Sequence, residues 1–144
     1  MNTGRRLLCM LLLSTVIATV GVPIGAAAST PTLHVKLNGP NVVHGGDPNG
    51  VADAKLTLDI HKQELCWAFS HLAGIASPTV ARISKGSKGR TGPSVLSLGR
   101  SYRSKGCVIV RASLLRAILS RPTAYYLTFW AGRKYKDGVV RGQL

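Results

Sequence analysis

Acidic side chains are scarce in this sequence of 144 residues, which holds 5 Asp and Glu against 19 Lys and Arg. So few carboxylates leave little material for catalysis by a pair of acids. Charged residues of both signs make up only 17% of the chain, and hydrophobic residues make up 45%. This composition is typical of a folded protein and too poor in charge for a disordered one. The length fits one domain, and the formal net charge of +14 bears on partners and solubility rather than on fold.

Long apolar runs are also missing, since the longest one falls short of the ~20 residues that a membrane-spanning helix needs. This run, residues 7–20, follows Arg5 and Arg6 and precedes small residues that end at Ala28. The three-part plan predicts a secretory signal peptide over residues 1–28, leaving one domain over residues 29–144. An uncleaved membrane anchor is the alternative, although Pro23 interrupts its extension.

Cysteine is rare, with three residues in the whole chain. Cys9 lies in the predicted signal peptide, so Cys66 and Cys107 remain in the domain. An even pair in an exported chain predicts a disulfide, because the compartment is oxidising. Two buried free thiols are the alternative.

Alternating apolar and polar residues at 33–37 and 52–60 predict half-buried strands, with a loop of turn-forming residues between them at 45–50. Behind Ser113, a candidate N-cap, apolar residues recur at helical spacing until Pro122. Short strands separated by turns favour a β-sandwich or barrel, here with one short helix. The other predicted strands lie near residues 65–69, 80–83, 95–98 and 108–112, and 124–130 and 139–144 form a closing hairpin.

The end of the chain resembles the closing signature of the CHRD (chordin-type) domain family, whose most specific piece is the terminal R-G-Q-L. Two earlier stretches resemble the family's G-D-P-x-G loop and its glycine loop, and the cysteine pair matches one seen in bacterial secreted members. The resemblance covers residues 33–144 and implies an all-β fold, an immunoglobulin-like or superoxide-dismutase-like antiparallel β-sandwich. The matching residues are Gly46, Asp47, Pro48, Gly50, Gly86, Gly89, Gly92, Pro93, Tyr125, Tyr126, Arg141, Gly142, Gln143 and Leu144.

Three histidines of the family pattern are replaced in this chain. Arg82 and Ser84 stand where the family has A-H-I-H, and Trp130 stands where it has N-V-H. These side chains are poor metal ligands, and the four remaining histidines lack ligand spacing. We therefore expect no metal, no cofactor and no catalytic residue; a metal-dependent, superoxide-dismutase-like activity is an alternative implied by the fold alone.

Two other motifs carry no predicted chemistry. Ser70 and His71 are neighbours on a strand and point to opposite faces, and no G-x-S-x-G elbow surrounds the serine. The loop at 86–90 lacks the Gly-Lys of a phosphate-binding P-loop. Gly86, Gly89 and the following Gly92 are expected to adopt backbone conformations that other residues avoid.

Basic residues are distributed unevenly along the predicted domain. Residues 29–81 hold 3 basic and 4 acidic side chains, whereas residues 82–144 hold 14 basic and 1 acidic. Lys85, Lys88 and Arg90 are candidate contacts for an anionic polymer, if the fold brings them near Arg100, Arg103 and Lys105 or near Arg133, Lys134 and Lys136. The alternative is a set of charges scattered over a solvated surface.

These observations favour an exported, non-enzymatic binding or structural module, secreted or associated with the cell envelope. The expected partner is an anionic cell-envelope polymer or another extracellular protein, with nucleic acid as an alternative and no small-molecule substrate. Arg141, Gly142 and Gln143 are assigned to the fold, and Arg141 is expected to pair with Asp47.

Overall fold

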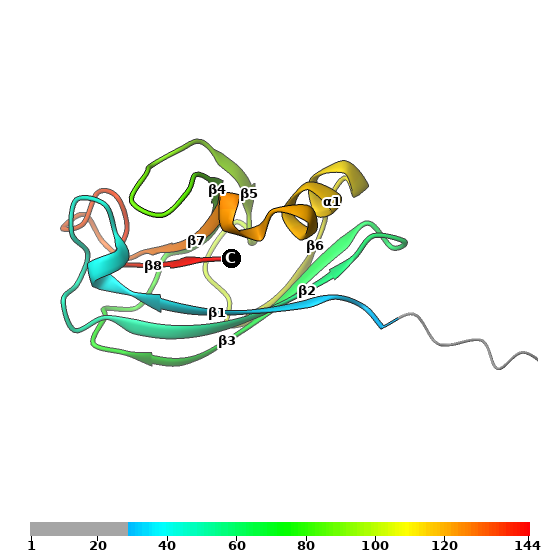
Figure 1. Cartoon of the computed structure of the whole chain (residues 1–144). Coiled ribbons are helices and arrows are strands. Elements are labelled where there is room, and N and C mark those ends of the chain that lie inside the picture. The colour runs from blue at the N-terminus through cyan, green and yellow to red at the C-terminus, as the bar shows by residue number, and fades with distance from the viewer. Residues whose placement is uncertain (1–28) are drawn as a thin grey trace, which may run out of the picture.

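The computed structural model describes residues 29–144, so the predicted signal peptide lies outside the described residues. Figure 1 shows this region as a curled sheet with one α-helix, α1 (Ala112–Ser120). Two short 3-10 helices, η1 (Gly39–Asn41) and η2 (Pro122–Ala124), lie beside strand ends. The strands are β1 (Thr32–Asn38), β2 (Val51–Asp59), β3 (Glu64–Ala73), β4 (Val80–Lys85), β5 (Ser94–Ser97), β6 (Lys105–Ile109), β7 (Tyr125–Trp130) and β8 (Val140–Gln143).

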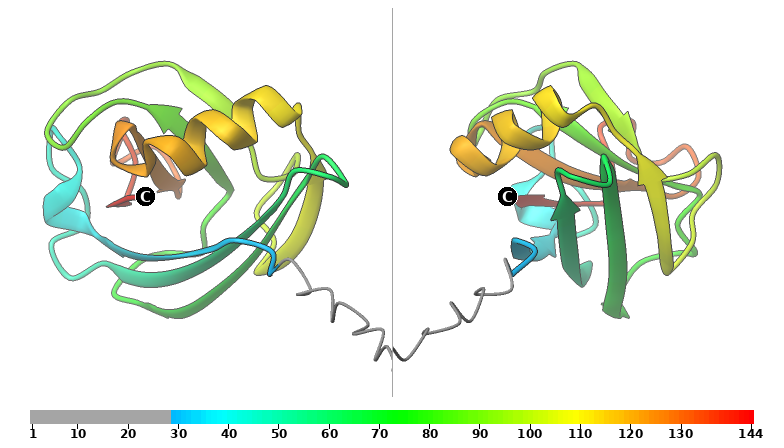
Figure 2. Two further views of the ribbon diagram at one scale, coloured as in Figure 1. Left: turned by 45° about the vertical axis from the view of Figure 1, so that its right-hand side comes forward. Right: turned by 90° about the vertical axis from the view of Figure 1, so that its right-hand side faces the viewer.

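All eight strands belong to one sheet, in the order β5-β4-β7-β8-β1-β2-β3-β6. Every neighbouring pair is antiparallel. The sheet curls so that its two halves face each other across the core (Figure 2). The predicted antiparallel all-β fold with one short helix is confirmed, and the two facing layers are halves of one continuous sheet.

The core lies on the inner face of the curled sheet. In β2 the apolar residues at every second position, from Ala52 to Leu58, are buried, while Lys55 between them is exposed. The alternation read from the sequence is therefore an inside-outside alternation, as expected for a strand with one solvated face. Phe129 of β7 is fully buried and packs against Phe69 of β3, with ring centroids 4.6 Å apart.

Helix α1 lies across one end of the curled sheet (Figure 2) and buries Leu115 and Ile118. It begins at Ala112, which the sequence pattern assigned to the preceding strand, and Ser113 lies inside its first turn. The predicted Ser113 N-cap is therefore wrong; Arg111 occupies the cap without a side-chain hydrogen bond. Among the described residues, no helix is both long and apolar enough to cross a bilayer.

Candidate functional site

The strands β4, β7 and β8 bring two arginines to the outer face of the sheet. Arg82 in β4 is paired with Thr128 in β7, and Thr128 is paired with Arg141 in β8. Directly opposed residues of antiparallel strands project to the same face. Because Ile83, Leu127 and Val140 fill the core side, the row from Arg82 to Arg141 belongs to the outer side.

The loop between β4 and β5, residues 86–93, folds back over this outer face; we call it the glycine loop. Its carbonyl oxygens accept hydrogen bonds from the C-terminal strand: Ser87 O from Arg141 Nη2 at 3.0 Å and Gly86 O from Gln143 Nε2 at 2.9 Å. The Tyr126 hydroxyl accepts from Gly92 N at 3.1 Å. Three separate pieces of the sequence resemblance thus meet at one place.

The glycines of this loop are needed for different reasons. Gly89 has a φ of +75°, in the region that favours glycine. Gly92 has no such φ, but a Cβ there would collide with the carbonyl oxygen of Lys85. Gly86 lies against the Tyr126 ring. The expectation of unusual backbone angles therefore holds for Gly89 and is wrong for Gly86 and Gly92, where the requirement is close packing.

Between the glycine loop and the turn that joins β7 to β8 lies a hollow of about 230 Å³, which we call the cationic pocket. Strand residues Arg82, Ser84, Tyr126 and Arg141 line it. The other lining residues are Val43, Thr91, Gly92, Ser94, Trp130, Lys136 and Asp137. The two loops leave opposite ends of the β4–β7 pair, so the pocket lies between them along the length of these strands.

Arg141 is the most deeply buried charge of the described chain, with 3% of its surface exposed. Its guanidinium carbon lies 3.5 Å from the centroid of the Tyr126 ring. Burial lowers the pKa of Arg141 from its ordinary value, and the nearby Tyr126 partly opposes this shift. The predicted pair with Asp47 is wrong: Asp47 Oδ1 instead accepts from Asn49 N at 3.2 Å, within its own loop, and Asp47 N donates to Val139 O.

Arg82, the second arginine of the row, is exposed and lies over Trp130, with its guanidinium carbon 5.5 Å from the ring centroid. The single acid in the pocket wall, Asp137, is paired with His44 at 2.7 Å between Oδ2 and Nδ1. Arg82, Lys136 and Arg141 therefore outnumber the single acid of the pocket wall.

The candidate polymer contacts lie on or beside the glycine loop. Lys85, Lys88 and Arg90 are all exposed, and Lys136 of the β7–β8 turn lines the cationic pocket. Lys85, Lys88 and Arg90 do not line this pocket themselves, so their grouping with either set of basic residues stays a prediction. Arg103 lies against the buried Trp67, whose indole nitrogen donates to its carbonyl oxygen at 2.9 Å.

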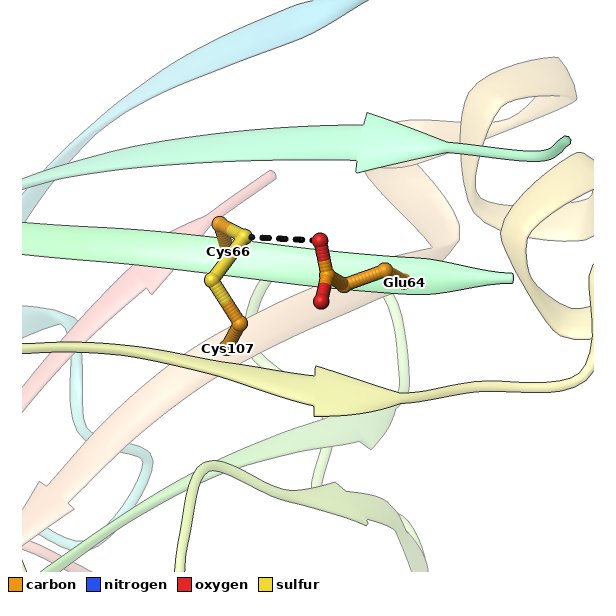
Figure 3. A group of neighbouring side chains, drawn as sticks. All are labelled: Glu64, Cys66 and Cys107. Atoms are coloured by element: carbon orange, nitrogen blue, oxygen red, sulfur yellow. Dashed lines mark hydrogen bonds between the residues drawn. A yellow bond between two sulfur atoms is a disulfide. The ribbon is translucent and has the colours of Figure 1, made fainter. Parts of the chain in front are cut away.

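Cys66 and Cys107 are directly opposed on β3 and β6 and form the predicted disulfide. In Figure 3 a carboxylate oxygen of Glu64 lies 3.4 Å from the sulfur of Cys66. A disulfide sulfur carries no proton, so this contact is not a hydrogen bond. These three residues form the compact group of possible metal ligands in the described region, but the two joined sulfurs are not thiolates and leave one carboxylate. The group therefore does not fit a metal ion.

The four histidines of the described region are all exposed. His44 and His71 are hydrogen-bonded to Asp137 and Asp53, at 2.7 and 2.9 Å between Nδ1 and Oδ2. Within residues 29–144 no hydrogen bond joins Ser70 to His71, whose Nδ1 is instead 2.9 Å from Asp53 Oδ2. His71 also has a φ of +52°, beside a register shift in the β2–β3 pairing.

Sequence reasoning missed the cationic pocket, although one signal pointed to it. The three positions at which this chain lacks the family's histidines, Arg82, Ser84 and Trp130, all line the pocket. Because Arg82 and Ser84 alternate on one strand and Trp130 lies on its neighbour, only the β4–β7 register shows that they share a face.

A family model described as the CHRD domain matches residues 33–144. No curated protein and no solved structure matches the chain. The match spans nearly all of the described region, including the glycine loop and the C-terminal strand. The chain therefore belongs to the CHRD domain family.

Proposed function

We propose that this CHRD domain protein is an exported, non-enzymatic binding module whose exposed Lys85, Lys88 and Arg90, in the basic segment of residues 82–144, hold an anionic polymer of the cell envelope or its surroundings. The family membership supports an interaction module, while the nature of the ligand rests on charge.

The observation that carries the proposal is the lack of internal partners for the basic segment. Its 14 Lys and Arg residues form no salt bridge within residues 29–144, where Lys62 pairs with Asp59, and His44 and His71 contact Asp137 and Asp53. Cations without protein partners keep a cloud of small anions. An anionic polymer displaces those ions, and their release favours binding.

Two further features support a location outside the cytoplasm. The Cys66–Cys107 bond is of a kind that persists in oxidising compartments, and residues 1–28 carry the pattern of a signal peptide. Another extracellular protein with an acidic surface could pair with the same basic residues and is an alternative partner.

The test is binding of residues 29–144 to polyphosphate, hyaluronate, DNA and the envelope fraction across a salt series. The variant replaces Lys85, Lys88 and Arg90 by Gln. The matched control replaces Arg111, Arg116 and Arg121, which are exposed on or beside α1, and so removes the same charge elsewhere.

We expect binding to fall steeply with salt. By the slopes measured for nucleic acids, removing three contacts should reduce the log-log salt slope by about 2 to 3 in the loop variant. The control variant should keep a slope near that of the unchanged domain. Binding that is indifferent to salt, or equally weakened in both variants, would contradict the proposal.

A further inference from the structure

The cationic pocket concentrates charge more strongly than the surface around it. Arg82, Lys136 and Arg141 converge on one hollow of about 230 Å³, with Asp137 as the single acid in its wall. At about 30 Å³ per water molecule, the hollow holds roughly seven waters. This space is sufficient for a small anionic group together with part of the molecule that carries it.

The two arginines are arranged as a pair. Arg82 and Arg141 lie two strands apart, on either side of Thr128, so their Cα atoms are on the order of 10 Å from each other. Each guanidinium lies over an aromatic ring, Trp130 for Arg82 and Tyr126 for Arg141. Stacking holds the plane of a guanidinium while leaving its N–H edge free to donate.

Most hydrogen-bond donors of the Arg141 guanidinium have no acceptor among the described residues. A guanidinium carries five N–H groups, and among the described residues one acceptor is present, the carbonyl oxygen of Ser87 at 3.0 Å. No carboxylate of the described region pairs with it. A buried charge without a counter-ion is costly, and this side chain, 97% of which is buried, lines the pocket.

Hydroxyl groups lie around the same hollow. Ser84, Thr91 and Ser94 line it. Hydroxyls donate readily to anionic oxygens, and guanidinium groups match planar and tetrahedral oxyanions with two parallel hydrogen bonds.

We propose that the cationic pocket is an oxyanion-binding site, in which Arg82 and Arg141 hold a phosphate or carboxylate group between them. The inference deepens the proposed function, on which it rests for the source of the group: the polymer presents the oxyanion, and the pocket fixes its position on the basic surface. Lys136 adds attraction at the rim, and the His44–Asp137 pair borders the site.

The experiment is an NMR titration of the ¹⁵N-labelled domain, residues 29–144, with inorganic phosphate and separately with glucuronate. Arg82→Gln is the test variant, because the exposed Arg82 side chain contributes little to the core. Arg116→Gln on α1 is its matched control, since the same charge is removed from an exposed position that does not line the pocket. Thermal melting of both variants shows that they are folded.

We expect shift changes confined to the pocket, at Arg82, Gly92 and Arg141 above all. Affinity should fall about tenfold in Arg82→Gln, the loss of one charge-assisted hydrogen bond, and stay unchanged in Arg116→Gln. Tighter binding of phosphate would indicate that the bound group belongs to a phosphate-bearing polymer. Tighter binding of glucuronate would indicate a carboxylate-bearing polymer.

Two results would overturn the inference. In the first, chemical-shift changes spread over the basic segment and both substitutions weaken anion binding equally. In the second, neither anion changes the spectrum. In both cases the polymer assay tests the proposed function independently. If polymer binding is still salt-dependent, the protein has a basic binding surface but no specific oxyanion pocket. Loss of polymer binding with a responsive pocket would refute the proposed function alone.

Discussion

Removing the Cys66–Cys107 disulfide should show how much the cross-link contributes to the free energy of unfolding, with few other effects. Both cysteines lie outside the core, with Cys66 partly exposed and Cys107 exposed. The double substitution to Ala therefore opens no buried cavity, and the surrounding β3–β6 register, from Glu64 with Ile109 to Ala68 with Lys105, has other hydrogen bonds to hold it. The fold should persist while the unfolded chain gains freedom.

The bond joins residues separated by 41 positions, which corresponds to about 4 kcal/mol in the chain-entropy model. With an unfolding entropy of roughly 2.1 cal/mol/K per residue, this loss should lower the melting temperature of residues 29–144 by about 16 °C. Urea unfolding gives the free energy, and the reduced unchanged protein, whose Cys66 and Cys107 are then thiols, is the control. A loss below about 1 kcal/mol would refute the argument that the bond mainly restricts the unfolded state.

Two further substitutions follow from local geometry. The Tyr102 hydroxyl is buried without a partner, so Tyr102→Phe should raise the unfolding free energy at neutral pH by about 1 kcal/mol. Burial raises the pKa of Tyr102 above 10.0, so the unfolded state loses the hydroxyl proton at a lower pH than the folded state does. The free energy of unfolding therefore falls as the pH rises above 10. Urea unfolding across this range should show a smaller fall in the Phe variant. Gly92→Ala places a methyl group against the Lys85 carbonyl oxygen and should displace the glycine loop and lower the melting temperature. Gly89→Ala, which has open space and only a positive φ, should cost about 1 kcal/mol; equal losses in both would contradict the close-packing explanation.

Strand positions could be predicted because burial on one face leaves a mark at every second residue. The alternations at 33–37 and 52–60 correspond to β1 and β2, and the closing hairpin is formed by β7 and β8. Helix α1 was found from its apolar spacing, but its start was misplaced. Nothing in the local sequence shows that the chain turns helical at Ala112, where no side chain caps the first turn.

The pairing of Arg141 was mispredicted because a sequence shows charge but not distance. Only five acids were available for it, and Asp47 was a reasonable partner by type. In the folded chain Asp47 belongs to a loop that binds the β7–β8 turn through its backbone, while Arg141 finds an aromatic face and a carbonyl oxygen.

The all-β class, the cysteine pair and the unequal distribution of charge can be read from the amino-acid sequence, because each depends on composition or on periodicity along the chain. That Arg82, Lys136 and Arg141 share one hollow follows from the folded chain and not from any local pattern. Arg82 precedes Lys136 by 54 positions, and the β4–β7–β8 register together with the folded-back glycine loop brings it close to Lys136 and Arg141. Such proximity is set by pairings between distant strands, which leave no local pattern in the sequence.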